Sequence, residues 1–154
     1  MTALDVFNAY YTARGGAGKL EKMKGIRTTG SMAAGAMELV MEQAHENGGA
    51  GYSRISAGGN VMQETRFDGT KGAEIAMGQT TPMDDSKIMD TRRNHDLLEF
   101  LHLEKYGISA ELLGIDKIDE VPQYCVEMRR DGRMIESHWF NVETGLRTRT
   151  MQTE

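Results

Sequence analysis

The sequence contains a single cysteine, so no disulfide can form within this chain. It has only two prolines among 154 residues, and its hydrophobic and charged fractions, 39% and 27%, are those of an ordinary folded protein rather than a disordered one. No run of residues approaches the roughly 20 apolar positions that a membrane-spanning helix needs. The length suits one domain with its own core, and we expect a single domain over residues 1–154.

Basic clusters are also absent. A net charge of −5 without dense lysine and arginine argues against nucleic acid as a partner. The N-terminus lacks the basic-then-apolar pattern of a signal peptide, so we expect either a cytosolic protein or one whose leader was removed. The twelve methionines are many, and their flexible thioethers suit either an irregular core or a surface that accepts varied apolar partners.

The first half of the chain predicts two helices followed by strands. Thr2 and Asp5 form the signature of a capping box for a helix over residues 3–14, and Gly15-Gly16 separates it from a short helix over 17–24. From Gly25 the hydrophobic period drops to two, and glycine-rich turns recur every eight to twelve residues. The predicted strands are 26–32, 37–43, 52–56, 61–67 and 73–77.

The middle of the chain predicts two more helices. One begins at Thr81-Pro82 with Asp84 in its first turn, and the other spans 95–106 with several leucines. A strand over 108–115 then leads into a C-terminal group of strands. The order predicts an α+β fold: a strongly curved antiparallel sheet, or incomplete β-barrel, with N-terminal helices and a helical lid on the concave face.

Residues 121–151 predict three antiparallel strands joined by tight turns. Asp131-Gly132 is a two-residue hairpin signal, because a type I′ turn needs positive φ at both positions. This turn pairs Arg130 with Arg133 and fixes which residues share a face. The predicted inward face is Tyr124, Val126, Met128, Ile135 and Trp139. The predicted solvent face includes Cys125, Glu127, Arg129, Glu136 and His138.

Catalytic and metal-binding arrangements are not evident. Cys125 and His138 are cross-strand neighbours in the predicted register, either as a metal or thiol–imidazole pair or by accident on a polar face, and no third ligand accompanies them. His95 and His102 lie two helical turns apart, too far for one metal. Nothing assembles a nucleophile, a base and oxyanion donors. We therefore expect a non-enzymatic protein without metal or cofactor.

Several phrases of the sequence resemble a known family in their order and spacing. They are Tyr10–Met23 (YYTARGGAGKLEKM), Gly25-Ile26, Phe67–Gly72 (FDGTKG), Leu112–Gly114, Ile118-Asp119, Tyr124–Met128 and Trp139–Leu146 (WFNVETGL). Together they span nearly the whole chain and are similar to the outer-membrane lipoprotein-sorting-protein family, the LolA/LolB-like superfamily of Gram-negative bacteria. The chain looks more like uncharacterised members, some of which are appended domains of larger proteins.

This resemblance implies an incomplete antiparallel barrel, a helical lid over a hydrophobic cavity, and a periplasmic or outer-membrane location after loss of a leader. We accordingly expect the protein to hold an apolar small molecule or acyl chain, in lipid or lipoprotein handling. The expected ligand-binding residues are Met32, Leu39, Met41, Met62, Met77, Met89, Leu97, Leu101 and Trp139. The alternative is a non-enzymatic interaction module that docks envelope proteins and has a filled core. The sequence leaves the oligomeric state open.

Overall fold

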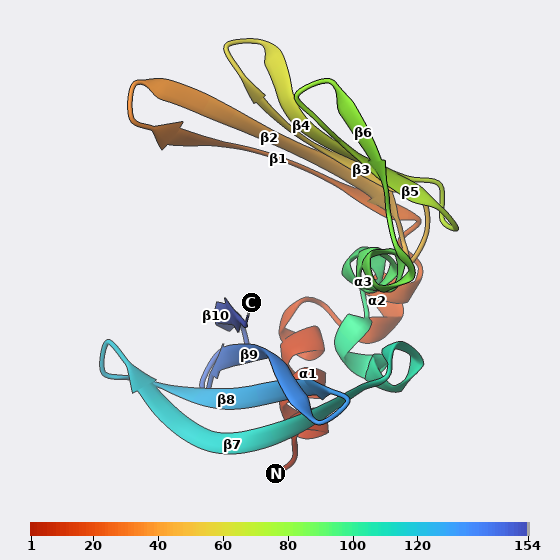
Figure 1. Cartoon of the computed structure of the whole chain (residues 1–154). Coiled ribbons are helices and arrows are strands. Elements are labelled where there is room, and N and C mark those ends of the chain that lie inside the picture. The colour runs from red at the N-terminus through yellow and green to blue at the C-terminus, as the bar shows by residue number, and fades with distance from the viewer. Residues whose placement is uncertain (154) are drawn as a thin grey trace. The chain divides into compact units, whose positions relative to one another are not determined.

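The computed structural model describes residues 1–153 and has an α+β fold with two antiparallel sheets (Figure 1). The helices are α1 (Ala3–Ala13), α2 (Ala17–Glu21) and α3 (Asp85–His95), with two short 3₁₀ turns, η1 (Glu99–Leu101) and η2 (Leu103–Tyr106). The predicted α+β class and N-terminal helices are confirmed. The strands form two separate sheets, however, whereas the sequence predicted one.

The first sheet contains six strands in sequential order. They are β1 (Gly25–Ala34), β2 (Met37–Glu46), β3 (Gly51–Ala57), β4 (Asn60–Phe67), β5 (Gly72–Ala76) and β6 (Gln79–Pro82). The second sheet has the order β10-β9-β8-β7. Its strands are β7 (Ile108–Ile118), β8 (Val121–Arg130), β9 (Arg133–Asn141) and β10 (Arg147–Gln152).

The chain divides into two compact units. The first unit consists of Met1–Lys22 together with the segment from Leu98 onward, and the second is the continuous segment Met23–Leu97. The four-stranded sheet therefore belongs to a unit built from both ends of the sequence. The six-stranded sheet and α3 form the other unit.

In the first unit, α1 packs its apolar side against the four-stranded sheet. The predicted capping box is present: the Asp5 amide donates to the Thr2 hydroxyl at 3.3 Å, and the Thr2 amide donates to the Asp5 carboxylate at 2.7 Å. Phe7 of this helix stacks on Phe100 at 4.8 Å between ring centroids and meets Phe140 of β9 edge-on at 5.9 Å. This aromatic cluster is the centre of the core.

The β8–β9 hairpin confirms one part of the predicted register. Asp131 and Gly132 both have positive φ, 50° and 76°, and Arg130 pairs with Arg133 as predicted. Val126 and Met128 face inward and are fully buried. The turn and the inward face of β8 were therefore predicted correctly, but Cys125, which was predicted to face solvent, is buried.

On β9 the predicted register is wrong by one residue. A bulge beside Met128 leaves Ile135 as an extra residue, so Met128 lies opposite Glu136 and Val126 lies opposite His138. An extra residue reverses which side chains point inward beyond it. Glu136 and His138 are consequently buried against the core, and Trp139 lies on the other face of the sheet, opposite Cys125. A metal or thiol–imidazole pair of Cys125 and His138, one of the two alternatives for these residues, is therefore excluded, because the two side chains lie on opposite faces.

In the second unit, α3 covers the base of one face of the six-stranded sheet. Asp84 caps the helix by accepting from the Lys87 amide at 2.8 Å. The His95 ring stacks on the His45 ring of β2, with centroids 4.4 Å apart and planes 6° from parallel. Lys87 forms an ion pair with Glu74 of β5 at 2.9 Å. These contacts hold α3 across several strands.

The predicted helix over 95–106 is absent. The chain leaves α3 at His95, and Asp96 is extended. Two short 3₁₀ turns follow and end at Gly107, whose φ is 65°. Leu98 and Leu103 are buried in the core of the first unit. The preceding helix also starts later than predicted, because Pro82 ends strand β6.

Candidate functional site

The two faces of the six-stranded sheet differ in chemistry. Residues opposite one another in the register, and alternate residues along each strand, share a face. The pairings Met32–Leu39 and Met41–Ile55 therefore place apolar side chains side by side, and Gly30 lies opposite Met41 on the same face. We call this surface the apolar face. Its members beyond the part that α3 covers are Met32, Met37, Leu39, Met41 and Ile55.

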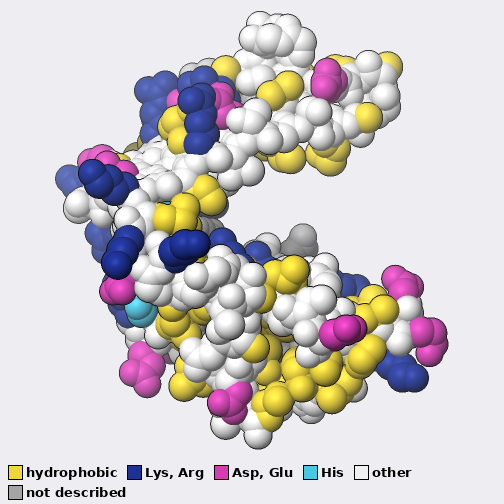
Figure 2. Space-filling view, turned by 180° about the vertical axis from the view of Figure 1, so that it is seen from behind, with side chains coloured by type: hydrophobic (Ala, Val, Ile, Leu, Met, Phe, Trp, Pro, Cys, Tyr) yellow, Lys and Arg dark blue, Asp and Glu magenta, His cyan; other side chains and the backbone are white. Residues whose placement is uncertain are grey.

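The apolar face is substantially exposed to solvent. Met32, Met37 and Met41 keep 50%, 58% and 42% of their surface accessible. Hydrophobic side chains are visible at the surface of this unit (Figure 2). Contiguous exposed apolar surface of this kind marks interaction or ligand sites on soluble proteins. The methionines also give it an adaptable surface, because thioethers re-pack around different shapes.

The other expected ligand-binding residues of this unit do not pair with Met32, Leu39 or Met41 in the register. Met62 lines a groove of about 510 Å³ with Met37 and Val40, near the tips of two hairpins. Met77 lies in the β5–β6 turn with a φ of 50° and is 95% exposed. Met89 is a half-exposed residue of α3, and Leu97 follows that helix.

Leu101 and Trp139 belong to the first unit. Leu101 packs against its hydrophobic core. The Trp139 indole N–H donates to the Asp116 carboxylate at 2.8 Å, and the Arg149 guanidinium lies 5.2 Å from the ring centroid. Of the nine expected residues, the structure brings three together on one surface: Met32, Leu39 and Met41.

The opposite face of the six-stranded sheet carries a network of charged side chains, which we call the charged face. Its members are Arg27, Glu42, Tyr52, Arg54, Glu64 and Arg66. Arg27 and the Tyr52 hydroxyl both donate to the Glu42 carboxylate, at 2.5 and 2.8 Å. This face was not predicted from the sequence, although its alternating charges at period two were a visible signal.

Glu64 joins two arginines on the charged face. The Arg66 Nε donates to its carboxylate at 2.5 Å, and Arg54 lies 3.5 Å from the same oxygen. The hydrogen bond from Arg66 and the nearby positive charges lower the pKa of Glu64. Glu42 has a lowered pKa for the same reason, chiefly because Arg27 donates to it. Both carboxylates are therefore ionised at neutral pH.

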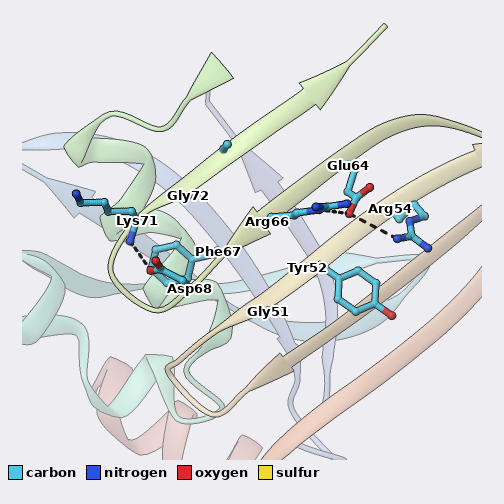
Figure 3. Close-up of a pocket in the computed structure, with 10 residues that line it drawn as sticks. Gly51, Tyr52, Arg54, Glu64, Arg66, Phe67, Asp68, Lys71 and Gly72 are labelled. Carbon is cyan, nitrogen blue, oxygen red and sulfur yellow. Dashed lines mark hydrogen bonds and ion pairs between the residues drawn. The ribbon is translucent and has the colours of Figure 1, made fainter. Parts of the chain in front are cut away.

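A groove of about 630 Å³ lies beside this network (Figure 3). Its charged lining consists of Arg54, Glu64, Arg66, Asp68 and Lys71. The Asp68 carboxylate accepts from the backbone amides of Thr70 and Lys71, each at 2.7 Å, which lowers its pKa. Within the groove the Glu64 carboxylate pairs with Arg54 and Arg66. Across strands, the Arg54–Glu64, Arg27–Glu42 and Tyr52–Glu42 contacts tie neighbouring strands of the charged face together.

A buried carboxylate–imidazole pair lies in the first unit and was not predicted. His138 Nε2 lies 3.0 Å from the Glu136 carboxylate, and its Nδ1 lies 3.2 Å from the Thr150 hydroxyl. Gln152 donates to the other Glu136 oxygen at 3.2 Å. The His138 ring also meets Phe100 edge-on at 5.0 Å. These contacts join β9 to β10 at the edge of the core, because Thr150 and Gln152 are exposed.

Residues 1–153 contain neither a metal-binding cluster nor a membrane-spanning helix. No three histidine, cysteine, aspartate or glutamate side chains are placed to hold one metal ion in this part of the chain. None of its helices is long and apolar enough to cross a membrane.

Comparison of the chain with protein-family models gives no match, and a search of curated proteins gives none either. We therefore infer the function from the geometry of the six-stranded sheet.

Proposed function

We propose that the apolar face holds an acyl chain or another apolar ligand, as part of lipid or lipoprotein handling in the periplasm or at the outer membrane. The observation that carries the proposal is the exposure of Met32, Met37 and Met41 on one face of a sheet. In this proposal the six-stranded sheet forms the wall of a strongly curved, incomplete barrel. Helix α3, at the base of the apolar face, is the helical cover.

The expected affinity follows from buried area. Each methylene that leaves water contributes roughly 0.8 kcal/mol, or about fourfold in Kd, and roughly half of that when the chain is half covered. Affinity should therefore rise about two- to fourfold for each added methylene until the ligand outgrows the face. Association costs offset part of the total, so short chains should bind too weakly to detect.

Saturated fatty acids of increasing length test the proposal by displacing a fluorescent apolar probe. The test variant is Met41→Asp, which places a charge in the apolar face. The matched control is Val40→Asp, because Val40 is the adjacent residue, is 40% exposed and points to the opposite face. Length-dependent binding that only Met41→Asp weakens supports the proposal. A response that is flat with chain length, or equal losses in both variants, refutes it.

An interaction module of a larger envelope assembly is the second candidate function. The observation that favours it is the openness of the apolar face, since an exposed patch suits a protein surface as well as a small ligand. A flat fatty-acid response, combined with loss of a purified partner's binding in Met41→Asp alone, identifies this function instead.

A further inference from the structure

We propose that the free edge of β1 pairs with the β1 edge of a second copy of this chain, in an antiparallel arrangement. The strand spans Gly25–Ala34 and is an outer strand of its sheet. Its side chains from Arg27 to Ala34 are all exposed. The inference is independent of the proposed function, because it concerns the edge of the sheet and not its apolar face.

The other three sheet edges carry features that discourage pairing. β6 is only four residues long and ends at Pro82, which has no amide hydrogen to donate. β7 is interrupted by a bulge at Leu113, and β10 has a register shift between Arg147 and Arg149. Short strands, prolines, bulges and charges are the usual protections of a sheet edge.

β1 is neither short nor bulged, and it contains no proline. It is ten residues long, and its register with β2 is unbroken. Its one charged residue, Arg27, is already paired with Glu42 of β2 at 2.5 Å. The Arg27–Glu42 pair leaves this edge without net charge. Two copies of the edge can therefore approach each other without like-charge repulsion.

We place Gly30 on the two-fold axis of the antiparallel pair. In this register the faces of the two sheets stay aligned. Thr29 then faces Ser31 of the second copy, and Arg27 faces Ala33. Large side chains meet small ones, since Ile26 faces Ala34. A Cβ added at Gly30 would meet no other heavy atom within 4 Å, so no side chain of the same copy blocks the approach of a second copy at the two-fold axis. The paired edge is roughly 30 Å long and one strand wide, which makes the interface small and the association weak.

Sedimentation velocity from roughly 1 µM to 1 mM tests the association, since a small interface requires high concentration. The variant Thr29→Lys/Ser31→Lys opposes two pairs of like charges across the axis and should weaken dimerisation about tenfold. Thr29→Lys/Ser31→Glu carries the same number of new charges but pairs them favourably, so it should dimerise at least as well as the original chain. Gln79→Lys/Thr81→Lys, on the β6 edge, should change nothing.

Disulfide trapping tests the register in a Cys125→Ser background, which removes the only native thiol. Gly30→Cys should give a covalent dimer on mild oxidation, because residues directly opposite each other across antiparallel strands lie within disulfide reach. Met41→Cys, directly opposite Gly30 but one strand inward, should not. A monomer at every concentration, a dimer indifferent to the β1 lysines, or equal trapping at both cysteines overturns the proposal.

Discussion

Truncation of Met128 should separate the packed core from the exposed apolar face. The Met128 side chain is fully buried, whereas Met41 keeps 42% of its surface accessible. Met128→Ala removes three heavy atoms from a site that cannot fully collapse, so we expect a loss of roughly 2–5 kcal/mol in the free energy of unfolding. Met41→Ala loses contacts on an open surface and should stay within about 1 kcal/mol.

Urea unfolding provides the assay. With a denaturant slope of roughly 2 kcal/mol per molar, a loss of 3 kcal/mol moves the midpoint by about 1.5 M. Trp139 fluorescence follows the four-stranded sheet, which contains Met128, and far-UV circular dichroism follows both sheets. Met128→Leu nearly conserves the volume and should cost less than about 1.5 kcal/mol. Equal losses for Met128→Ala and Met41→Ala would refute the reasoning, because the apolar face would then be packed like a core.

Two further predictions concern the six-stranded unit. Burial lowers the pKa of His95. Below about pH 6.5 the unfolded chain therefore binds a proton at this residue that the folded chain resists binding. The free energy of unfolding should consequently fall as pH drops from 7.5 to 5.5. His95→Gln should reduce this fall in thermal melts. A fall of unchanged size would show that protonation of His95 is not its cause. Gly51→Ala should lower the free energy of unfolding by roughly 1–3 kcal/mol in urea titrations, because its Cβ would lie 2.5 Å from the His45 Cβ. Gly18→Ala is the control. A Cβ at Gly18 meets open space, so this change should not destabilise the protein.

Local signals predicted the parts of the fold that depend on neighbours in sequence. The Thr2 capping box and the Asp131-Gly132 turn each need only a few adjacent residues, and both are present. The register beyond the turn depends on a bulge that leaves no hydrophobic signature. Alternation assigned Trp139 to the interior, whereas the structure buries Glu136 and His138 as a bonded pair, which a hydrophobic pattern cannot reveal.

The candidate site was predictable only within paired strands. Met32, Leu39 and Met41 were expected among the ligand-binding residues, and they share a face because β1 and β2 are joined by a tight turn and have a regular register. Leu101 and Trp139 were added to the same site on the assumption of one sheet. The separation into two sheets is set by packing between distant segments, and no local pattern carries that information.

Because the first unit uses both ends of the chain, the order of synthesis delays its completion. Val6, Phe7, Tyr10 and Tyr11 of α1 leave the ribosome early, but Phe140 on β9 follows only about 130 residues later. At typical rates of bacterial and eukaryotic translation this interval lasts roughly 6–26 s. The six-stranded unit, which is continuous in sequence, emerges complete within that time. Throughout it, an aromatic helix surface without its sheet is exposed to proteases, chaperones and other nascent chains.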